Sequence, residues 1–184
     1  MIHTIRLDHV LRETIKTPYT NLVTRATGAA VRTSIEATIA GSDCGTALLD
    51  FSAVGLVDLS CADEVVAKLL LGGARDGGAS GDRFIMLSGL HENHTEAIDH
   101  VLNHHQLAIA VVGADGDRPH VLGHVSPDLR SAFVQLQQSG PATATAMAEA
   151  LEWAVDRALE ALDALVGLRL LRREGASYFP LLSQ

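Results

Sequence analysis

Cysteine and aromatic residues are scarce in this sequence. Only two of the 184 residues are cysteine, Cys44 and Cys61, and they lack the CxxC spacing of metal and redox sites. Two cysteines with this spacing form no disulfide framework, which favours a reducing compartment. Phenylalanine, tyrosine and tryptophan make up only 4% of the chain, so the core must be built mainly from Leu, Val, Ile and Ala.

Long apolar runs and a secretory leader pattern are also lacking. No run approaches the ~20 apolar residues that are needed to span a bilayer. Residues 1–7 alternate apolar and polar side chains and include His3 and Arg6, which is unlike a signal peptide. We therefore expect a cytoplasmic protein with no membrane partner.

Positive charge is in deficit throughout the chain. Lys and Arg number 14 against 22 Asp and Glu, which gives a formal net charge of −8. Residues 1–124 hold 9 basic and 15 acidic residues, and residues 125–184 hold 5 and 7, so neither part is basic. The chain as a whole therefore provides no long-range attraction for nucleic acid or an anionic membrane, although a local basic patch is compatible with these counts.

The N-terminal two thirds of the chain alternates between two apolar patterns. Short apolar runs typical of strands cover residues 2–7, 46–51, 83–88 and 107–113, and helical spacing appears between them over residues 22–40, 61–71 and 91–105. Thr20 or Asn21 is the expected cap of the first helix. The glycine-rich stretch 72–81 follows a helix and lacks the Lys-Ser/Thr ending of a phosphate loop, so we interpret it as a connector. This order predicts an α/β domain over residues 1–122.

The last third of the chain has a different pattern. Ser126-Pro127 is a typical helix start, with serine as the cap and proline in the first turn. Helical spacing follows over residues 127–139, 143–151 and 155–165, and two short apolar segments flank the turn at residues 174–177. Three helices and a terminal hairpin predict a separate α+β domain over residues 126–184.

The segment 48–71 contains two short acidic motifs, Asp50-Phe51-Ser52 at the end of a strand and Asp58-Leu59-Ser60 before a helix. In this it resembles the STAS domain of anti-sigma factor antagonists. The preceding helix, with Arg25 and Arg32, looks more like an STAS-like branch of unknown function. The resemblance implies a mixed sheet with helices and a protein partner, either a GHKL-type serine kinase or an anti-sigma factor. It implies partner contact at four residues: Asp58, Ser60, Cys61 and Asp63.

Ser60 is the candidate phosphorylation site that the resemblance implies. A phosphate at a helix start could be stabilised by the helix dipole or could block a partner surface. The alternative is that Ser60 only caps the helix, a role worth about 1 kcal/mol. The chain departs from the family pattern at Cys61, where glycine is usual.

Five histidines fall between residues 91 and 105. His100 and His104 are four residues apart, so they share one helix face and could chelate a divalent metal. The alternative is a solvated helix face, since no third ligand is evident. Strand-end carboxylates such as Asp50 could in principle perform acid–base chemistry, but no nucleophile or cofactor motif accompanies them, so we expect no enzyme activity and no cofactor.

The segment 143–182 resembles the winged helix-turn-helix of bacterial transcription regulators. The matching pattern is Leu159, Leu162 and Leu165 in its third helix, followed by the hairpin. The candidate DNA-binding residues are Arg157, Arg169, Arg172 and Arg173. Three acids accompany Arg157 on the third helix, so the alternative is an interaction module that does not contact DNA.

Taken together, these patterns predict a non-enzymatic regulatory protein in which an STAS-like domain binds a protein partner and a winged helix passes on its state. The alternative is a direct DNA-binding transcription regulator whose STAS-like part senses a small ligand. In both cases the resemblance to winged-helix regulators implies a homodimer.

Overall fold

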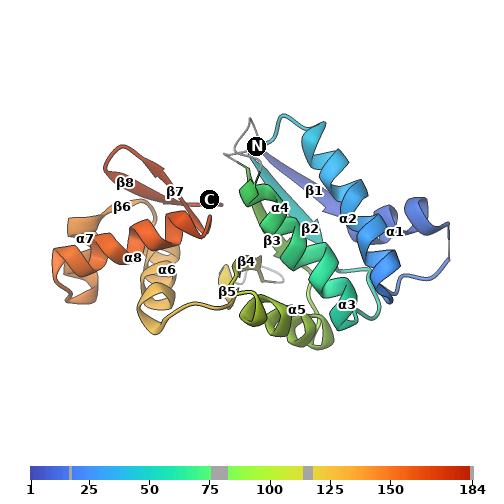
Figure 1. Ribbon diagram of the computed structural model, residues 1–184. Coiled ribbons are helices and arrows are strands. Elements are labelled where there is room, and N and C mark those ends of the chain that lie inside the picture. Colours follow the sequence, from blue (N-terminus) through green and yellow to red (C-terminus); the bar gives the residue numbers. More distant parts are fainter. Residues whose placement is uncertain (17, 76–82, 114–117, 183–184) are drawn as a thin grey trace.

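The computed structural model describes residues 1–16, 18–75, 83–113 and 118–182, and it contains two sheets (Figure 1). The first is built from β1 (Ile2–Arg6), β2 (Thr46–Asp50), β3 (Phe84–Ser88), β4 (Ala108–Val112) and β5 (His120–Gly123). Its helices are α1 (Leu7–Ile15), α2 (Arg25–Ala40), α3 (Leu59–Ala62), the π-helical segment η1 (Asp63–Lys68), α4 (Leu69–Arg75) and α5 (Glu92–His104).

The first sheet has the order β1-β2-β3-β4-β5. The first four strands are parallel, and each lies beside the next one in the chain, with Ile5 opposite Leu49 and Leu49 opposite Leu87. β5 pairs antiparallel with β4. Crossovers between parallel strands share one hand, so strands added in a single direction place their helices on one face. The prediction of an α/β structure with a mixed sheet is confirmed.

The two faces of this sheet belong to different hydrophobic clusters. Alternate strand residues such as Leu49, Leu87 and Ile109 pack under the N-terminal helices. Their neighbours Met86 and Ala110 belong to the second cluster, which continues into the C-terminal helices. The period of two along each strand therefore divides the molecule into its layers.

The C-terminal part contains α6 (Pro127–Ser139), β6 (Ala142–Thr143), α7 (Ala144–Leu151), α8 (Val155–Gly167), β7 (Leu171–Glu174) and β8 (Ser177–Pro180). Its small antiparallel sheet has the order β6-β8-β7. The side chain of Ser126 accepts from the Leu129 N–H at the start of α6, and Thr143 accepts from the Ala146 N–H at the start of α7. The expected three helices and terminal hairpin are present.

Three local predictions were wrong. α2 starts at Arg25 and is capped by Thr24, because the residues before it run extended and Leu22 forms a parallel bridge with Val57. α1 covers residues 7–15, of which only Leu7 had a predicted element, as the end of the expected strand. The expected connector at 72–81 starts later, because α4 continues to Arg75, and residues 76–82 lie outside the described part.

Within the described residues, no helix combines the length and the apolar character that crossing a bilayer requires.

Candidate functional site

Asp58 is the cap of α3. Its carboxylate accepts hydrogen bonds from the Cys61 N–H at 2.7 Å, from the Ser60 hydroxyl at 2.8 Å and from the Thr24 N–H at 2.8 Å. Ser60 therefore lies inside the first turn, and the prediction that Ser60 is the cap was wrong. The reason is that the residue before Leu59 is the last with an extended backbone, as a cap requires.

The Asp58 carboxylate is held in its charged form. Burial opposes ionisation, but the hydrogen bonds from the Thr24 and Cys61 N–H groups outweigh it and lower the pKa of Asp58 below its usual range. The Ser60 oxygen, the candidate phosphorylation site, thus lies in contact with a fixed negative charge.

Cys61, the next expected partner residue, has its side chain in the interior. It is fully buried and donates through Sγ to the Thr24 carbonyl at 2.9 Å. Burial, followed by the nearby charge of Asp58, raises the pKa of Cys61 to about 12, so the thiol stays protonated. Gly28 packs against it so closely that a Cβ there would lie 3.0 Å from the Cys61 Cα and 3.0 Å from the Glu64 Cβ.

Glu64 forms an ion cluster that the sequence did not reveal. Only 3% of Glu64 is exposed. It pairs with Arg25 at 2.9 Å, with Arg32 at 3.4 Å and also with Lys68. Burial opposes its ionisation, but these three cations lower the pKa of Glu64. Only the Glu64–Lys68 spacing of four residues is a local signal, since both arginines come from α2, more than thirty residues earlier.

Asp63, the fourth expected partner residue, lies beside this cluster. Its carboxylate pairs with Arg25 at 2.8 Å and with the His105 ring Nε2 at 2.7 Å. Burial opposes ionisation, but Arg25 and His105 lower the pKa of Asp63. Asp63 and Glu64 are adjacent in η1, and both reach Arg25. Such single π-helical turns are often found at functional sites.

His94 fixes the loop that leads into Asp58. It is fully buried, and its Nε2 lies 2.6 Å from the Gly55 carbonyl while its Nδ1 accepts from the His91 N–H. These contacts assign the proton to Nε2, because a carbonyl only accepts. Burial lowers the pKa of His94, so the ring is neutral. His94 is buried because it lies on the apolar side of α5 with Ile98 and Val101.

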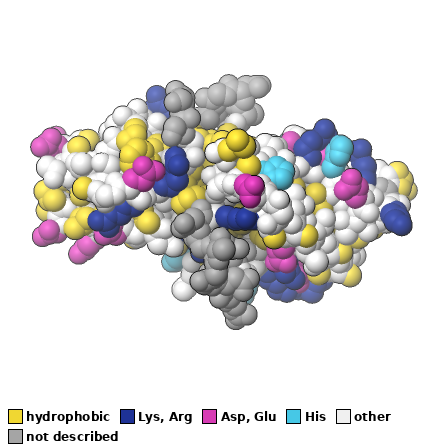
Figure 2. All heavy atoms as spheres, turned by 90° about the horizontal axis from the view of Figure 1, so that it is seen from above, with side chains coloured by type: hydrophobic (Ala, Val, Ile, Leu, Met, Phe, Trp, Pro, Cys, Tyr) yellow, Lys and Arg dark blue, Asp and Glu magenta, His cyan; other side chains and the backbone are white. Residues whose placement is uncertain are grey.

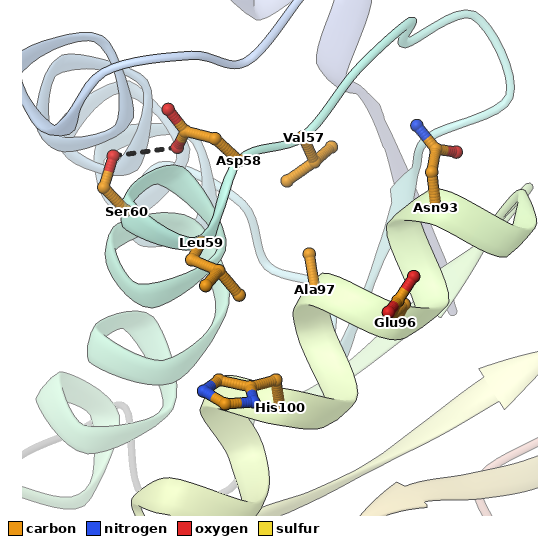
Figure 3. A pocket seen from close by; sticks show the side chains of 8 residues that line it. All are labelled: Val57, Asp58, Leu59, Ser60, Asn93, Glu96, Ala97 and His100. Atoms are coloured by element: carbon orange, nitrogen blue, oxygen red, sulfur yellow. Dashed lines mark hydrogen bonds between the residues drawn. The ribbon is translucent and has the colours of Figure 1, made fainter.

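An open groove runs between α3 and α5. Its largest hollow is about 670 Å³ and is lined by Val57, Asp58, Leu59, Ser60, Asn93, Glu96, Ala97 and His100. Figure 3 shows Leu59 directed from α3 towards α5, where Ala97 and His100 lie, and the Ser60 hydroxyl joined to Asp58. A second hollow of about 440 Å³ extends the groove past Leu59 and Ser60 to Asp63 and His104.

Two exposed leucines border Asp58. Leu56 is 57% exposed and Leu59 is 51% exposed, although both belong to a sequence otherwise rich in buried leucine. The loop that carries Leu56 is held from two sides, since the Leu56 N–H donates to the Asn21 side chain and its carbonyl accepts from the Leu22 N–H. The exposed apolar side chains thus stand on a well-anchored backbone.

The two candidate metal ligands, His100 and His104, both lie on the exposed side of α5 and line the hollow between Glu96 and Asn103. Among the residues that the structure describes, no three His, Cys, Asp or Glu side chains are grouped so that they could hold a metal ion. His100 and His104 therefore remain a pair without a third ligand in that part of the chain.

Asp50, the remaining acid of interest, accepts the Ser52 N–H at 2.9 Å in the turn after β2. All three carboxylates, those of Asp50, Asp58 and Asp63, therefore accept structural hydrogen bonds.

The candidate DNA-binding arginines are engaged with their own unit. Arg157 makes two hydrogen bonds to the Asp128 carboxylate, at 2.8 and 2.7 Å, and lies over the Trp153 ring. Arg173 pairs with Asp163 at 2.9 Å. The positive charges of Arg157 and Arg173 are thus each paired with a carboxylate of the same chain.

The other two candidate arginines, Arg172 and Arg169, lie on β7 and in the turn after α8. Arg172 precedes Arg173 on β7, so their side chains leave opposite faces of the strand, and Arg172 donates to the Pro180 carbonyl at 3.3 Å. Arg172 and Arg173 therefore do not belong to one basic face of the strand. Arg169 lies in the turn after α8 and has a positive φ of 58°.

In comparisons with known proteins, no family model, curated protein or solved structure matches this chain.

Proposed function

We propose that this protein is a non-enzymatic, cytoplasmic regulator whose STAS-like N-terminal part binds a protein partner. The observation that carries the proposal is the surface at Leu56–Ser60, where two exposed leucines flank Asp58 beside an open groove. Exposed apolar side chains on a firmly held backbone, rimmed by polar groups, are typical of protein interaction sites. The resemblance to anti-sigma factor antagonists points to a serine kinase or an anti-sigma factor as the partner.

The contact between Ser60 and Asp58 supports regulation by phosphorylation. The Ser60 hydroxyl donates to the Asp58 carboxylate at 2.8 Å. A phosphate on Ser60 has no such proton to donate and adds a charge of nearly −2 beside a carboxylate that is already ionised. The repulsion would weaken the hold of Asp58 on the Cys61 and Thr24 N–H groups and displace the Leu56–Ser60 surface. Phosphorylation would therefore release the partner.

The C-terminal part is proposed to be a winged helix. Its support is the element order, in which β6 falls between α6 and α7, and the hairpin of β7 and β8 follows α8. Charge favours a role in protein contact over DNA contact. On the face seen in Figure 2, acidic side chains gather at the end formed by the C-terminal part, while basic ones are more frequent at the opposite end. The acidic end formed by the C-terminal part would repel DNA, which is a polyanion.

Site-specific photocrosslinking tests the docking surface. A benzophenone side chain placed at Leu59 should give a discrete protein adduct in the cells that make this protein. The matched control is Leu71, an exposed leucine on α4, which should give none. Ser60→Asp should abolish the Leu59 adduct, and Ser60→Ala should keep it. Peptide mapping of the purified protein should locate phosphate on Ser60.

Equal adducts at Leu59 and Leu71, or a Leu59 adduct that Ser60→Asp leaves unchanged, would contradict the proposal. DNA contact is tested separately by fluorescence anisotropy with fragments of the organism's own genome. Binding that weakens steeply with salt and is lost in Arg172→Ala/Arg173→Ala would favour the DNA-binding alternative.

A further inference from the structure

A second, more enclosed cavity lies where the C-terminal part meets the sheet. Its volume is about 120 Å³. The first sheet and its helices contribute Leu70, Arg83 and Ile85, and the turn after α8 contributes Leu168, Arg169 and Leu170. Among the described residues, those that line this cavity include two arginines and no acid. The cavity thus combines apolar walls with two guanidinium groups.

One nitrogen of the Arg83 guanidinium is a buried hydrogen-bond donor without an acceptor among the described residues. This nitrogen is Nη1, which has no hydrogen-bond partner within the part of the chain that the structure describes. Arginine stays protonated at any ordinary pH and is a donor only. A buried donor without an acceptor is rare in proteins, and an absent ion or ligand is one of its recognised explanations. The planar guanidinium fits a carboxylate by two parallel hydrogen bonds.

Arg169 occupies a backbone position that favours glycine. α8 ends in a motif in which the Leu170 N–H donates to the Leu165 carbonyl at 2.9 Å and Arg169 takes a positive φ of 58°. Glycine is the usual residue there, because a Cβ is strained in this conformation. A strained side chain that lines a cavity is a reason to look for a function of that side chain.

We propose that this cavity binds a small organic anion, a monocarboxylate with an apolar body about the size of a benzene ring. The carboxylate would accept from Arg83 and lie near Arg169, and the apolar body would contact Leu70, Ile85 and Leu168. In another protein an apolar cavity of ~150 Å³ admits benzene. A cavity of about 120 Å³ therefore holds an apolar body no larger than one benzene ring. Such a ligand would join the sheet to the C-terminal part at one point.

This site is separate from the docking surface, because the two share no residue. Isothermal titration calorimetry on the full chain tests it with three probes: benzoate, benzyl alcohol and acetate. Benzoate should bind with a stoichiometry of one. Benzyl alcohol, which lacks the charge, and acetate, which lacks the body, should each bind at least about tenfold more weakly.

Two variants and a control locate the site. Arg83→Gln should weaken benzoate binding about tenfold or more, since it removes the charge and the paired donors. Arg169→Gly should also weaken binding while raising the thermal midpoint of the free protein, because it relieves the positive φ, so loss of binding there is not loss of fold. Arg12→Gln removes an exposed cation on α1 and should bind benzoate like the wild type.

The proposal is overturned if benzoate shows no heat of binding at millimolar concentration. It is also overturned if benzyl alcohol binds as tightly as benzoate, or if Arg83→Gln binds benzoate like the wild type. These results say nothing about crosslinking at Leu59, so the two proposals succeed or fail independently.

Discussion

At the scale of single residues, Asp58 concentrates several roles in one carboxylate. It ends the extended segment, caps α3, ties that helix start to Thr24 and accepts the Ser60 hydroxyl. Ser60 by contrast contributes one hydroxyl hydrogen bond, at an interior position of a helical turn. The residue that would be modified is therefore not the residue that holds the site together, which is a useful separation for a switch.

Asp58→Ala should destabilise the protein by about 2 kcal/mol, since the variant loses a helix cap and leaves the Thr24 N–H without its acceptor. Ser60→Ala is the matched control. It should change stability by less than about 0.5 kcal/mol, because the lost hydrogen bond is partly offset by the better helix propensity of alanine. Urea denaturation followed by circular dichroism measures both. A larger loss for Ser60→Ala than for Asp58→Ala would show that serine is the cap.

At the scale of elements, the site depends on α5 holding the loop at Gly55 and on α2 holding η1. His94 supplies the first contact through its ring, and Arg25 and Arg32 supply the second through Glu64. Both contacts join segments more than thirty residues apart. The placement of His94 depends on pH, because the ring must stay neutral for its Nδ1 to accept from the His91 N–H.

Stability should fall as the pH drops below about 6.5, the ordinary pKa of histidine. Burial lowers the pKa of His94 in the folded protein, so below that pH the unfolded chain binds a proton that the folded chain does not, and unfolding is favoured. His94→Gln should remove this part of the dependence.

Urea denaturation of wild type and His94→Gln at several pH values between neutral and mildly acidic conditions measures the effect. The other eight histidines are common to both proteins, so the difference between the two curves isolates His94. Curves that run parallel over the whole range would show that His94 takes up its proton equally in the folded and unfolded states.

At the scale of the whole molecule, the sheet is shared between the N-terminal and C-terminal parts. Met86, Ala110 and Val121 belong to the same buried cluster as Phe133 and Leu162. Arg130 on α6 also donates to the Val121 carbonyl at 2.7 Å. Displacement of the C-terminal part would thus expose one face of the sheet.

A chain ending at His124 should be less stable than the full chain and prone to self-association. It would expose the sheet face formed by Met86, Ala108, Ala110 and Val121, whose burial stabilises the protein by up to about 5 kcal/mol. Thermal unfolding and size-exclusion chromatography measure the two effects. A monomeric fragment that melts with the full chain would show that the shared cluster contributes little.

Sequence periodicity and capping alone determined the limits of β1 to β4 to within a residue, most of the helices and the helix start at Ser126. These features depend on neighbouring residues, which is why a single sequence reveals them. Periodicity and capping missed α1, β5 and β6. The candidate site was located only in part, since Asp58, Ser60 and Asp63 were identified but the cap was assigned to the wrong residue. What only the tertiary structure decided are the long-range contacts: the arginines around Glu64, the anchor at His94 and the cavity with Arg83 and Arg169. Their partners lie on other elements, and no local pattern records which elements will meet.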